Sequence, residues 1–383
     1  MSRLAAPRPR PIDLAHGRAA QCAGDVPRAE RVADVPPAVA DVTSAQSDGR
    51  PGRWTAATRQ IVAATVAALA AAMAGIVGAG TSAAGALAAA LCGAALVSLA
   101  VGSRLSRAGH RYAGLVLTAI PVGLALPIAI TVGRLGRLSL PDAGRVGLLV
   151  AWLALGVGIG LGRRRRGALA GAVLGVTLTG LPLLLGLTMP AYEVDALVAC
   201  VAVVACGLLP WYALSASDLT GLDDAVLGAA PARTRVRVTL DEAYGTLTWS
   251  TLAVALTLTL STWGLFATGR GPATVLGLAV VAIVALRTRS LPLRWQVVPL
   301  WAAVVVPLAA LLGQLGATRP ALAATIAIGA GLVMAVGAGL DLSGPQRARL
   351  RRLGDLTELV CAVAVLPLML AVFGVFTDLL GTF

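Results

Sequence analysis

The chain has 383 residues, of which 57% are hydrophobic and only 13% are charged, and its formal net charge is +13. A soluble domain of this length does not have such a composition. In a soluble protein the excess of arginine would suggest nucleic-acid binding, but here the arginines lie between long apolar stretches and form no basic domain or face. We therefore expect no nucleic-acid partner.

Residues 1–57 are rich in Pro, Arg, Asp and Ala and contain few large apolar side chains. Such a segment cannot bury enough apolar surface to offset the entropy lost on ordering. It also lacks the early apolar run of a signal peptide. We expect a disordered cytoplasmic tail, followed by a helical transmembrane domain over residues 58–383.

Eleven apolar stretches fill this second part. A membrane core of roughly 30 Å requires about 20 apolar residues in a helix, and barrel strands would be shorter and alternate with polar residues. The fold class is therefore predicted to be all-α, a polytopic membrane protein with about 11 transmembrane helices. The predicted spans are residues 59–79, 82–102, 112–133, 146–162, 167–189, 194–214, 245–267, 271–287, 295–315, 320–341 and 355–377.

Arginine placement predicts the orientation, because basic residues are concentrated in cytoplasmic loops. With a cytoplasmic N-terminus, the inside loops hold seventeen arginines and the outside loops hold five. The five outside arginines are Arg134, Arg137, Arg145, Arg270 and Arg319. An odd number of spans places the C-terminus outside. We expect a multi-pass protein of the cell membrane.

The acidic residues are expected at span ends or in loops, and the sequence has no His-x-x-Glu-His motif or Ser/His pairing. We therefore expect no catalysis, no metal and no cofactor. Asp355 and Glu358 open the last predicted span, where carboxylates suit the positive end of a helix dipole. The alternative is that Asp355 and Glu358 dock a basic partner segment.

Glycines at four-residue spacing predict close helix packing in the fourth and fifth spans. The candidates are Gly156 and Gly160 in the fourth span and Gly167, Gly171 and Gly175 in the fifth. The two runs flank one short loop, so we expect them to pack on each other within the chain. A subunit interface is the alternative.

The loop between these runs contains four consecutive arginines, Arg163, Arg164, Arg165 and Arg166. We interpret them as an orientation determinant that touches anionic lipid headgroups, with a protein contact as the alternative. The other candidate contact regions on the cytosolic side are the loop 215–244 and the loop 342–354, with Arg347 and Arg351.

The order of several short segments resembles the EccD family of type VII (ESX) secretion membrane subunits. Leu209-Pro-Trp closes the sixth span, and Arg287-Thr-Arg-Ser-Leu-Pro-Leu-Arg-Trp-Gln joins the eighth span to the ninth. The arginines of 347–352 then lead to Asp355-Leu-Thr-Glu and a final helix with Leu366-Pro-Leu-Met-Leu. The resemblance covers residues 55–383. It implies a structural, non-enzymatic subunit that scaffolds the export path.

The resemblance also implies partners: EccB-, EccC- and EccE-like components, a second copy of the chain in a homodimer, and lipids. Members of the family carry an N-terminal ubiquitin-like domain, for which the 57-residue segment is too short and too rich in proline and arginine. We therefore expect this chain to lack that domain. The alternative function is a small-molecule permease or exporter, with prolines and glycines forming broken helices around a site at the bilayer midplane.

Overall fold

The computed structural model describes residues 56–78, 84–216, 233–290, 294–339, 344–376 and 379. All regular secondary structure in these ranges is helical. The α-helices are α2 (Ala56–Gly78), α3 (Ala84–Arg107), α4 (Arg111–Gly136), α5 (Leu140–Leu155), α6 (Arg166–Leu185), α7 (Ala191–Ala216), α9 (Arg233–Ala267), α10 (Gly271–Arg287), α11 (Arg294–Thr318), α12 (Pro320–Gly339) and α13 (Gly344–Val372). A π-helix, η2 (Gly156–Leu161), continues α5, and a short 3₁₀-helix, η3 (Thr288–Ser290), follows α10.

Each of the eleven predicted spans coincides with one of these helices, and the prediction of an all-α polytopic membrane protein is confirmed. Nine helices among the described residues are long and apolar enough to cross a membrane. Helix α10 and the segment Pro320–Leu332 of α12 are shorter apolar helices. The tail predicted for residues 1–57 falls, up to residue 55, outside the described residues.

Three helices begin at least six residues earlier than their predicted spans. Helix α5 begins at Leu140 instead of 146, α9 at Arg233 instead of 245, and α13 at Gly344 instead of 355. In each case the added residues are more polar than the span itself. Arg, Glu and Thr are compatible with a helix that emerges from the apolar layer, so hydropathy marks where the membrane begins and not where the helix begins. What remains of the predicted loop 215–244, residues 217–232, lies outside the described residues.

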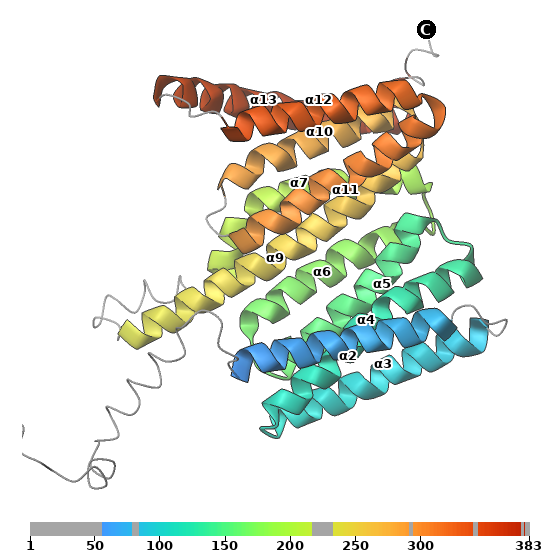
Figure 1. Cartoon of the computed structure of the whole chain (residues 1–383), viewed down its shortest axis with the longest axis vertical. Coiled ribbons are helices and arrows are strands. Elements are labelled where there is room, and N and C mark those ends of the chain that lie inside the picture. The colour runs from blue at the N-terminus through green and yellow to red at the C-terminus, as the bar shows by residue number, and fades with distance from the viewer. Residues whose placement is uncertain are drawn as a thin grey trace, which may run out of the picture. The chain divides into compact units, whose positions relative to one another are not determined.

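The helices form the unit Ala57–Phe383, in which sequence neighbours run antiparallel (Figure 1). Close glycine contacts show this directly. A Cβ atom added at Gly102 near the end of α3 would lie 3.0 Å from Cβ of Leu117 near the start of α4. One added at Gly133, near the end of α4, would lie 2.8 Å from Cβ of Ala143 in the first turn of α5.

The bundle consequently has two ends. One end holds the arginines of the predicted inside loops and is called the arginine-rich end. There, α3, η2, α7 and α10 finish while α2, α4, α6, α9, α11 and α13 begin. At the opposite end, α4, α6, α9 and α11 finish while α5, α7, α10 and α12 begin.

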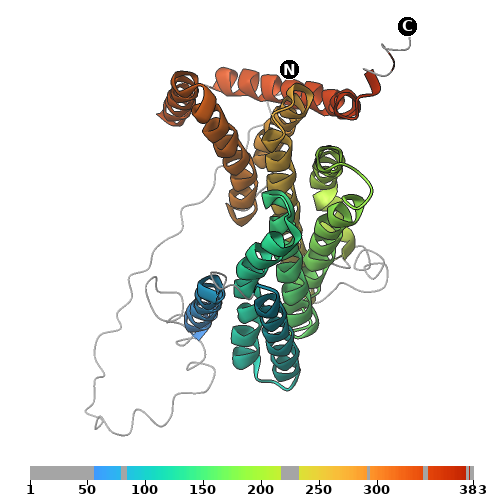
Figure 2. The same ribbon diagram turned by 90° about the vertical axis from the view of Figure 1, so that its right-hand side faces the viewer.

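Helix α9 lies at the centre of the bundle, in contact with α5, α6, α7, α10 and α11. In the most apolar part of α9, 67% of the residues are buried, against 6% in α2 and 11% in α13. The two views place α2 and α3 at one edge of the bundle and α12 and α13 at the other (Figure 1 and Figure 2). The largest core cluster joins α7, α9, α10 and α11 around Leu258, Phe266, Leu276 and Leu300.

Candidate functional site

Arg145 of α5 and Asp195 of α7 form an ion pair inside the bundle, near its opposite end. Arg145 is 2% exposed and Asp195 is 3% exposed. Nη1 of Arg145 also donates to Oδ1 of Asp142 at 2.6 Å, and the hydroxyl of Ser139 donates to Oδ2 of Asp142 at 2.6 Å. Buried charges are tolerated when they are paired and hydrogen-bonded. These four side chains therefore form one network that ties α5 to α7.

The assignment of Arg145 to an outside loop is wrong, because α5 begins at Leu140 and Arg145 lies inside it. A signal for this start was present in the sequence. Ser139 caps the helix by accepting a hydrogen bond from the Asp142 backbone N–H at 3.4 Å, and Pro141 occupies the first turn. A Ser-x-x-Asp pattern with proline just inside is a typical helix N-terminus. The capping pattern would have placed Arg145 in the second turn of a helix.

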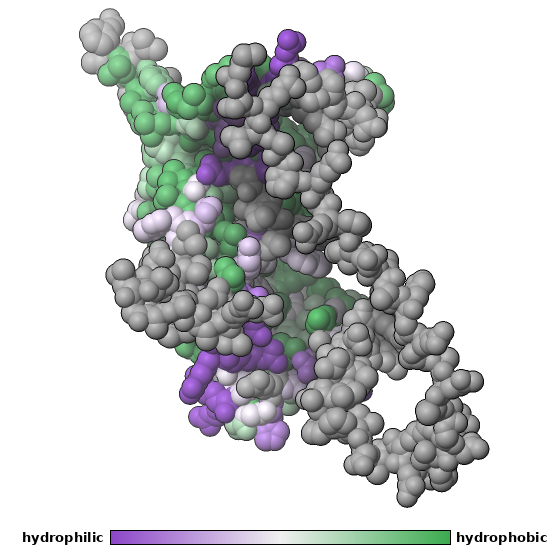
Figure 3. Space-filling view, turned by 90° about the vertical axis from the view of Figure 1, so that its left-hand side faces the viewer, coloured by the Kyte–Doolittle hydropathy of each residue, from purple (hydrophilic) through white to green (hydrophobic). Residues whose placement is uncertain are grey.

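The four-arginine loop lies at the arginine-rich end, between η2 and α6. Arg163 is half-buried and the other three arginines are exposed. Arg164 has a φ of 54°, which is a left-handed backbone conformation. Figure 3 looks onto this end, and hydrophilic residues gather on the face that it shows.

Two cavities lie beside this loop. One, of about 410 Å³, is lined by Arg107, Arg164 and Arg166 together with Gly160, Leu161 and Leu169. The other, of about 220 Å³, is lined by Arg163, Arg165 and Arg166 but also by Asp241 and Glu242 of α9. The loop therefore borders a purely basic cavity on one side and a mixed-charge cavity on the other.

The acidic pair of the last span lies well inside α13, because this helix begins at Gly344. The helix-dipole interpretation of Asp355 and Glu358 is therefore wrong, since the effect of the dipole is confined to the first turn. Instead, Glu358 pairs with Nη1 of Arg287 at 3.4 Å, and Asp355 lies 3.9 Å from Nη2 of Arg289. The first pair joins α13 to the last residue of α10, and the second joins it to η3. Among the other candidate contacts on α13, Arg351 is exposed, whereas the Arg347 side chain is outside the described part of the chain.

The candidate packing glycines lie at three different contacts. A Cβ atom added at Gly156 would lie 3.0 Å from Cβ of Ala172, and one added at Gly160 would lie 3.0 Å from Cα of Leu169. These two glycines of η2 thus face α6, as the hairpin hypothesis requires.

The glycines of α6 face other partners. A Cβ atom at Gly167 would lie 2.7 Å from the backbone nitrogen of Thr246, and one at Gly171 would lie 2.8 Å from the carbonyl carbon of Trp249. Both of these neighbours belong to α9. Gly175 packs instead against the indole ring of Trp152 in α5. The glycine run of α6 therefore brings the backbones of α6 and α9 together, and only Gly175 faces the preceding span.

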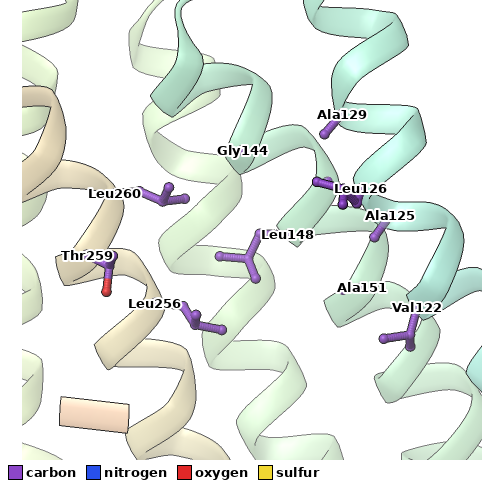
Figure 4. A pocket seen from close by; sticks show the side chains of 11 residues that line it. Val122, Ala125, Leu126, Ala129, Gly144, Leu148, Ala151, Leu256, Thr259 and Leu260 are labelled. Atoms are coloured by element: carbon purple, nitrogen blue, oxygen red, sulfur yellow. The ribbon is translucent and has the colours of Figure 1, made fainter. Parts of the chain in front are cut away.

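An apolar groove of about 320 Å³ lies between α4, α5 and α9 (Figure 4). Its polar lining residue, Thr259, donates its hydroxyl to the backbone carbonyl of Ala255 at 2.8 Å. Such a groove suits hydrocarbon. Within the described ranges, no group of three or more His, Cys, Asp and Glu residues could hold a metal ion.

The helix lengths, their apolar composition and their antiparallel order define a multi-pass α-helical membrane protein. A family model described as the EccD-like transmembrane domain matches residues 57–382, and the chain belongs to this family. The resemblance drawn from the order of short segments is thereby confirmed.

Among solved structures, the chain is similar to one titled "Structure of protomer 1 of the ESX-3 core complex". The TM-score is 0.52 at 18% identity, and the match covers 95% of this chain and 81% of that one. At this identity the likeness concerns the fold. No curated protein matches the chain.

Proposed function

We propose that this chain is a structural membrane subunit of a type VII protein secretion complex, which scaffolds the export path and performs no catalysis of its own. The observation that carries the proposal is the match of the EccD-like transmembrane domain model to residues 57–382. The fold shared with the ESX-3 core complex protomer supports it.

The distribution of burial is consistent with a scaffold. Helix α9 provides a buried centre, whereas α2, α12 and α13 present large apolar side chains outward, including Val77, Ile328 and Val363. A peripheral helix that buries little within its own chain offers its remaining surface to lipid or to other subunits. We propose that these outer helices contact lipids and a second copy of the chain in a homodimer.

The arginine-rich end is the proposed cytoplasmic end, with the N-terminus inside. We propose that it contacts the EccB-, EccC- and EccE-like components, and that the EccC-like ATPase supplies the energy for export. The proposed protein-contact residues are Arg347 and Arg351, whereas Arg163, Arg164, Arg165 and Arg166 are proposed to touch anionic lipid headgroups, with a protein contact as the alternative. Glu358 contributes indirectly, because its pairing with Arg287 holds α13 in place.

Co-purification of the full chain from its native membrane in a mild detergent tests this proposal. We expect an EccC-like ATPase and EccB- and EccE-like components to elute with it in a stoichiometric complex. A chain that purifies alone under conditions that keep other multi-subunit membrane complexes intact would contradict the proposal.

A matched pair of variants tests which end makes the contacts. The double variant Arg351→Glu/Arg352→Glu reverses two exposed charges on α13 at the arginine-rich end. Arg137→Glu/Arg319→Glu reverses two exposed charges at the opposite end. We expect the first variant to lose the partners and the second to retain them.

One observation favours the permease alternative, namely the buried ion pair of Arg145 and Asp195. Ionisable groups inside a membrane commonly mark transport pathways. Both residues lie within the first two turns of their helices, about 7 Å from the helix end at 1.5 Å per residue. Carriers place their sites near the bilayer midplane. Proteoliposomes with the purified chain should therefore show no solute flux, and a flux abolished by Asp195→Asn would favour the permease.

A further inference from the structure

The basic cavity at the arginine-rich end is assembled from segments far apart in the sequence. Arg107 is the last residue of α3, Arg164 lies in the turn after η2, and Arg166 is the first residue of α6. Their side chains line one cavity of about 410 Å³. Gly160 of η2 and Leu169 of α6, which lie against each other, also line this cavity.

No acidic residue lines this cavity. Neither Arg107 nor Arg164 forms an ion pair with any acidic side chain that the structure describes. The neighbouring cavity differs, because Asp241 and Glu242 line it together with its arginines. The guanidinium groups of Arg107 and Arg164 thus line one cavity without a carboxylate beside them, and a bound anion would supply the opposite charge.

One backbone feature adds to the attraction for an anion. Helix α6 begins at Arg166, which lines the cavity, and its N-terminus has no side-chain cap. Uncapped N–H groups in the first turn of a helix favour negative charge nearby.

The rest of the lining is apolar and consists of Gly160, Leu161 and Leu169. The cavity lies where the apolar segments Gly85–Arg107 and Leu140–Leu161 end and Arg166–Leu185 begins. This is the level of the lipid headgroups in a bilayer. A phospholipid has a phosphate beside the start of two hydrocarbon chains, which matches arginines beside leucines.

We propose that this cavity binds the phosphodiester of an anionic phospholipid through Arg107, Arg164 and Arg166, with the lipid's glycerol and first methylenes against Leu161 and Leu169. Basic pockets between transmembrane helices bind such headgroups by charge-assisted hydrogen bonds. The proposal concerns the chain alone and does not depend on a role in secretion.

Native mass spectrometry of the delipidated full chain in detergent, titrated with phosphatidylglycerol, tests this site. The variant Arg107→Gln/Arg164→Gln should bind its first phosphatidylglycerol at least about tenfold more weakly than the parent chain, since each charge-assisted hydrogen bond is worth a factor of about ten. The variant Arg107→Lys/Arg164→Lys retains the charges and should bind more tightly than the glutamine variant. Unchanged circular dichroism and gel-filtration profiles establish that each variant is folded.

The matched control is Arg137→Gln/Arg319→Gln, which removes two exposed arginines at span ends of the opposite end. Arg137 also has a left-handed backbone, with a φ of 48°, so the control reproduces the conformation of Arg164. We expect this control to bind phosphatidylglycerol as the parent chain does. An equal loss of phosphatidylglycerol binding in both double variants, or no loss in Arg107→Gln/Arg164→Gln, would overturn the proposal.

Two further titrations identify the ligand chemistry. Zwitterionic phosphatidylcholine should bind at least about tenfold more weakly than phosphatidylglycerol, because it lacks the net negative charge that the arginines attract. Equal binding of the two lipids would contradict an anion site. Inorganic phosphate at millimolar concentration should not displace the bound lipid, and displacement would assign the cavity to free phosphate and overturn the lipid proposal.

Discussion

The carboxylate of Asp195 in α7 lies against Gly264 of α9, in the space that a Cβ atom would occupy in any other residue. A protein interior has little empty volume, so this space exists because position 264 is a glycine. It allows Asp195 to reach the guanidinium of Arg145 on α5. The ion pair between α5 and α7 therefore depends on a third helix.

The first prediction concerns Gly264→Ala. The added methyl group would displace the Asp195 carboxylate and weaken a buried ion pair, whose disruption costs about 3–5 kcal/mol. We expect a clearly lower unfolding temperature for the detergent-purified variant. The control is Gly313→Ala in α11, where the space around a Cβ atom is open, and there we expect a change within about 1 kcal/mol. Equal unfolding temperatures for both variants would refute this account.

The second prediction is a double-mutant cycle on the pair itself. Asp195→Leu and Arg145→Met each leave one buried charge without this partner, so each should destabilise the protein by about 3–5 kcal/mol. The double variant replaces the pair with apolar side chains and should cost less than the sum of the single changes. The free energies of unfolding of the four proteins give the coupling, and strict additivity would show that the pair is not coupled.

Hydropathy predicted the helices but not their interior contacts. Eleven apolar stretches suffice to place eleven helices, because a bilayer imposes a length and composition on each. Residues 233–244 and 344–354 were missed because they are helical but more polar than the spans they precede. Hydropathy does not mark the start of a helix that extends beyond the apolar layer. Only at α5 does another pattern, the Ser139 cap, mark that start.

The sequence also predicted candidate contact residues without identifying their partners. Glycine spacing marks which residues of α6 can approach a neighbour closely, but the neighbour of Gly171 is Trp249, 78 positions later, and no local pattern names it. Asp195 and Glu358 were expected near span ends, and their partners Arg145 and Arg287 belong to other helices. Pairing between distant helices depends on the tertiary arrangement, which periodicity and composition do not encode.

The third prediction concerns the contact between α6 and α9. In Gly171→Ala the new Cβ atom would lie 2.8 Å from the carbonyl carbon of Trp249, so the two backbones must separate. Overpacking of this kind costs about 1–3 kcal/mol. We expect the unfolding temperature to fall, whereas the matched variant Gly180→Ala on the same helix should be tolerated, because its nearest neighbour is Leu149 Cδ1 at 3.9 Å. The contact has no role in stability if both variants unfold at the parent temperature.

The fourth prediction concerns orientation, which arginine counts predict from seventeen on one side of the bilayer and five on the other. Arg164 and Arg137 are suited to testing it, because both are exposed and lie at the two different ends of the bundle. A cysteine replaces one of them in a chain whose five native cysteines are changed to alanine. Intact cells are then treated with a membrane-impermeant maleimide.

We expect Arg137→Cys to be labelled in intact cells and Arg164→Cys to be labelled only after the membrane is opened. Labelling of both positions after lysis is the control for reactivity, and the cysteine-free chain is the control for background. Loss of a single arginine leaves the excess on the inside almost unchanged, so the substitution should not reverse the protein. The reverse pattern in intact cells would place the arginine-rich end outside, where it could not contact a cytoplasmic ATPase.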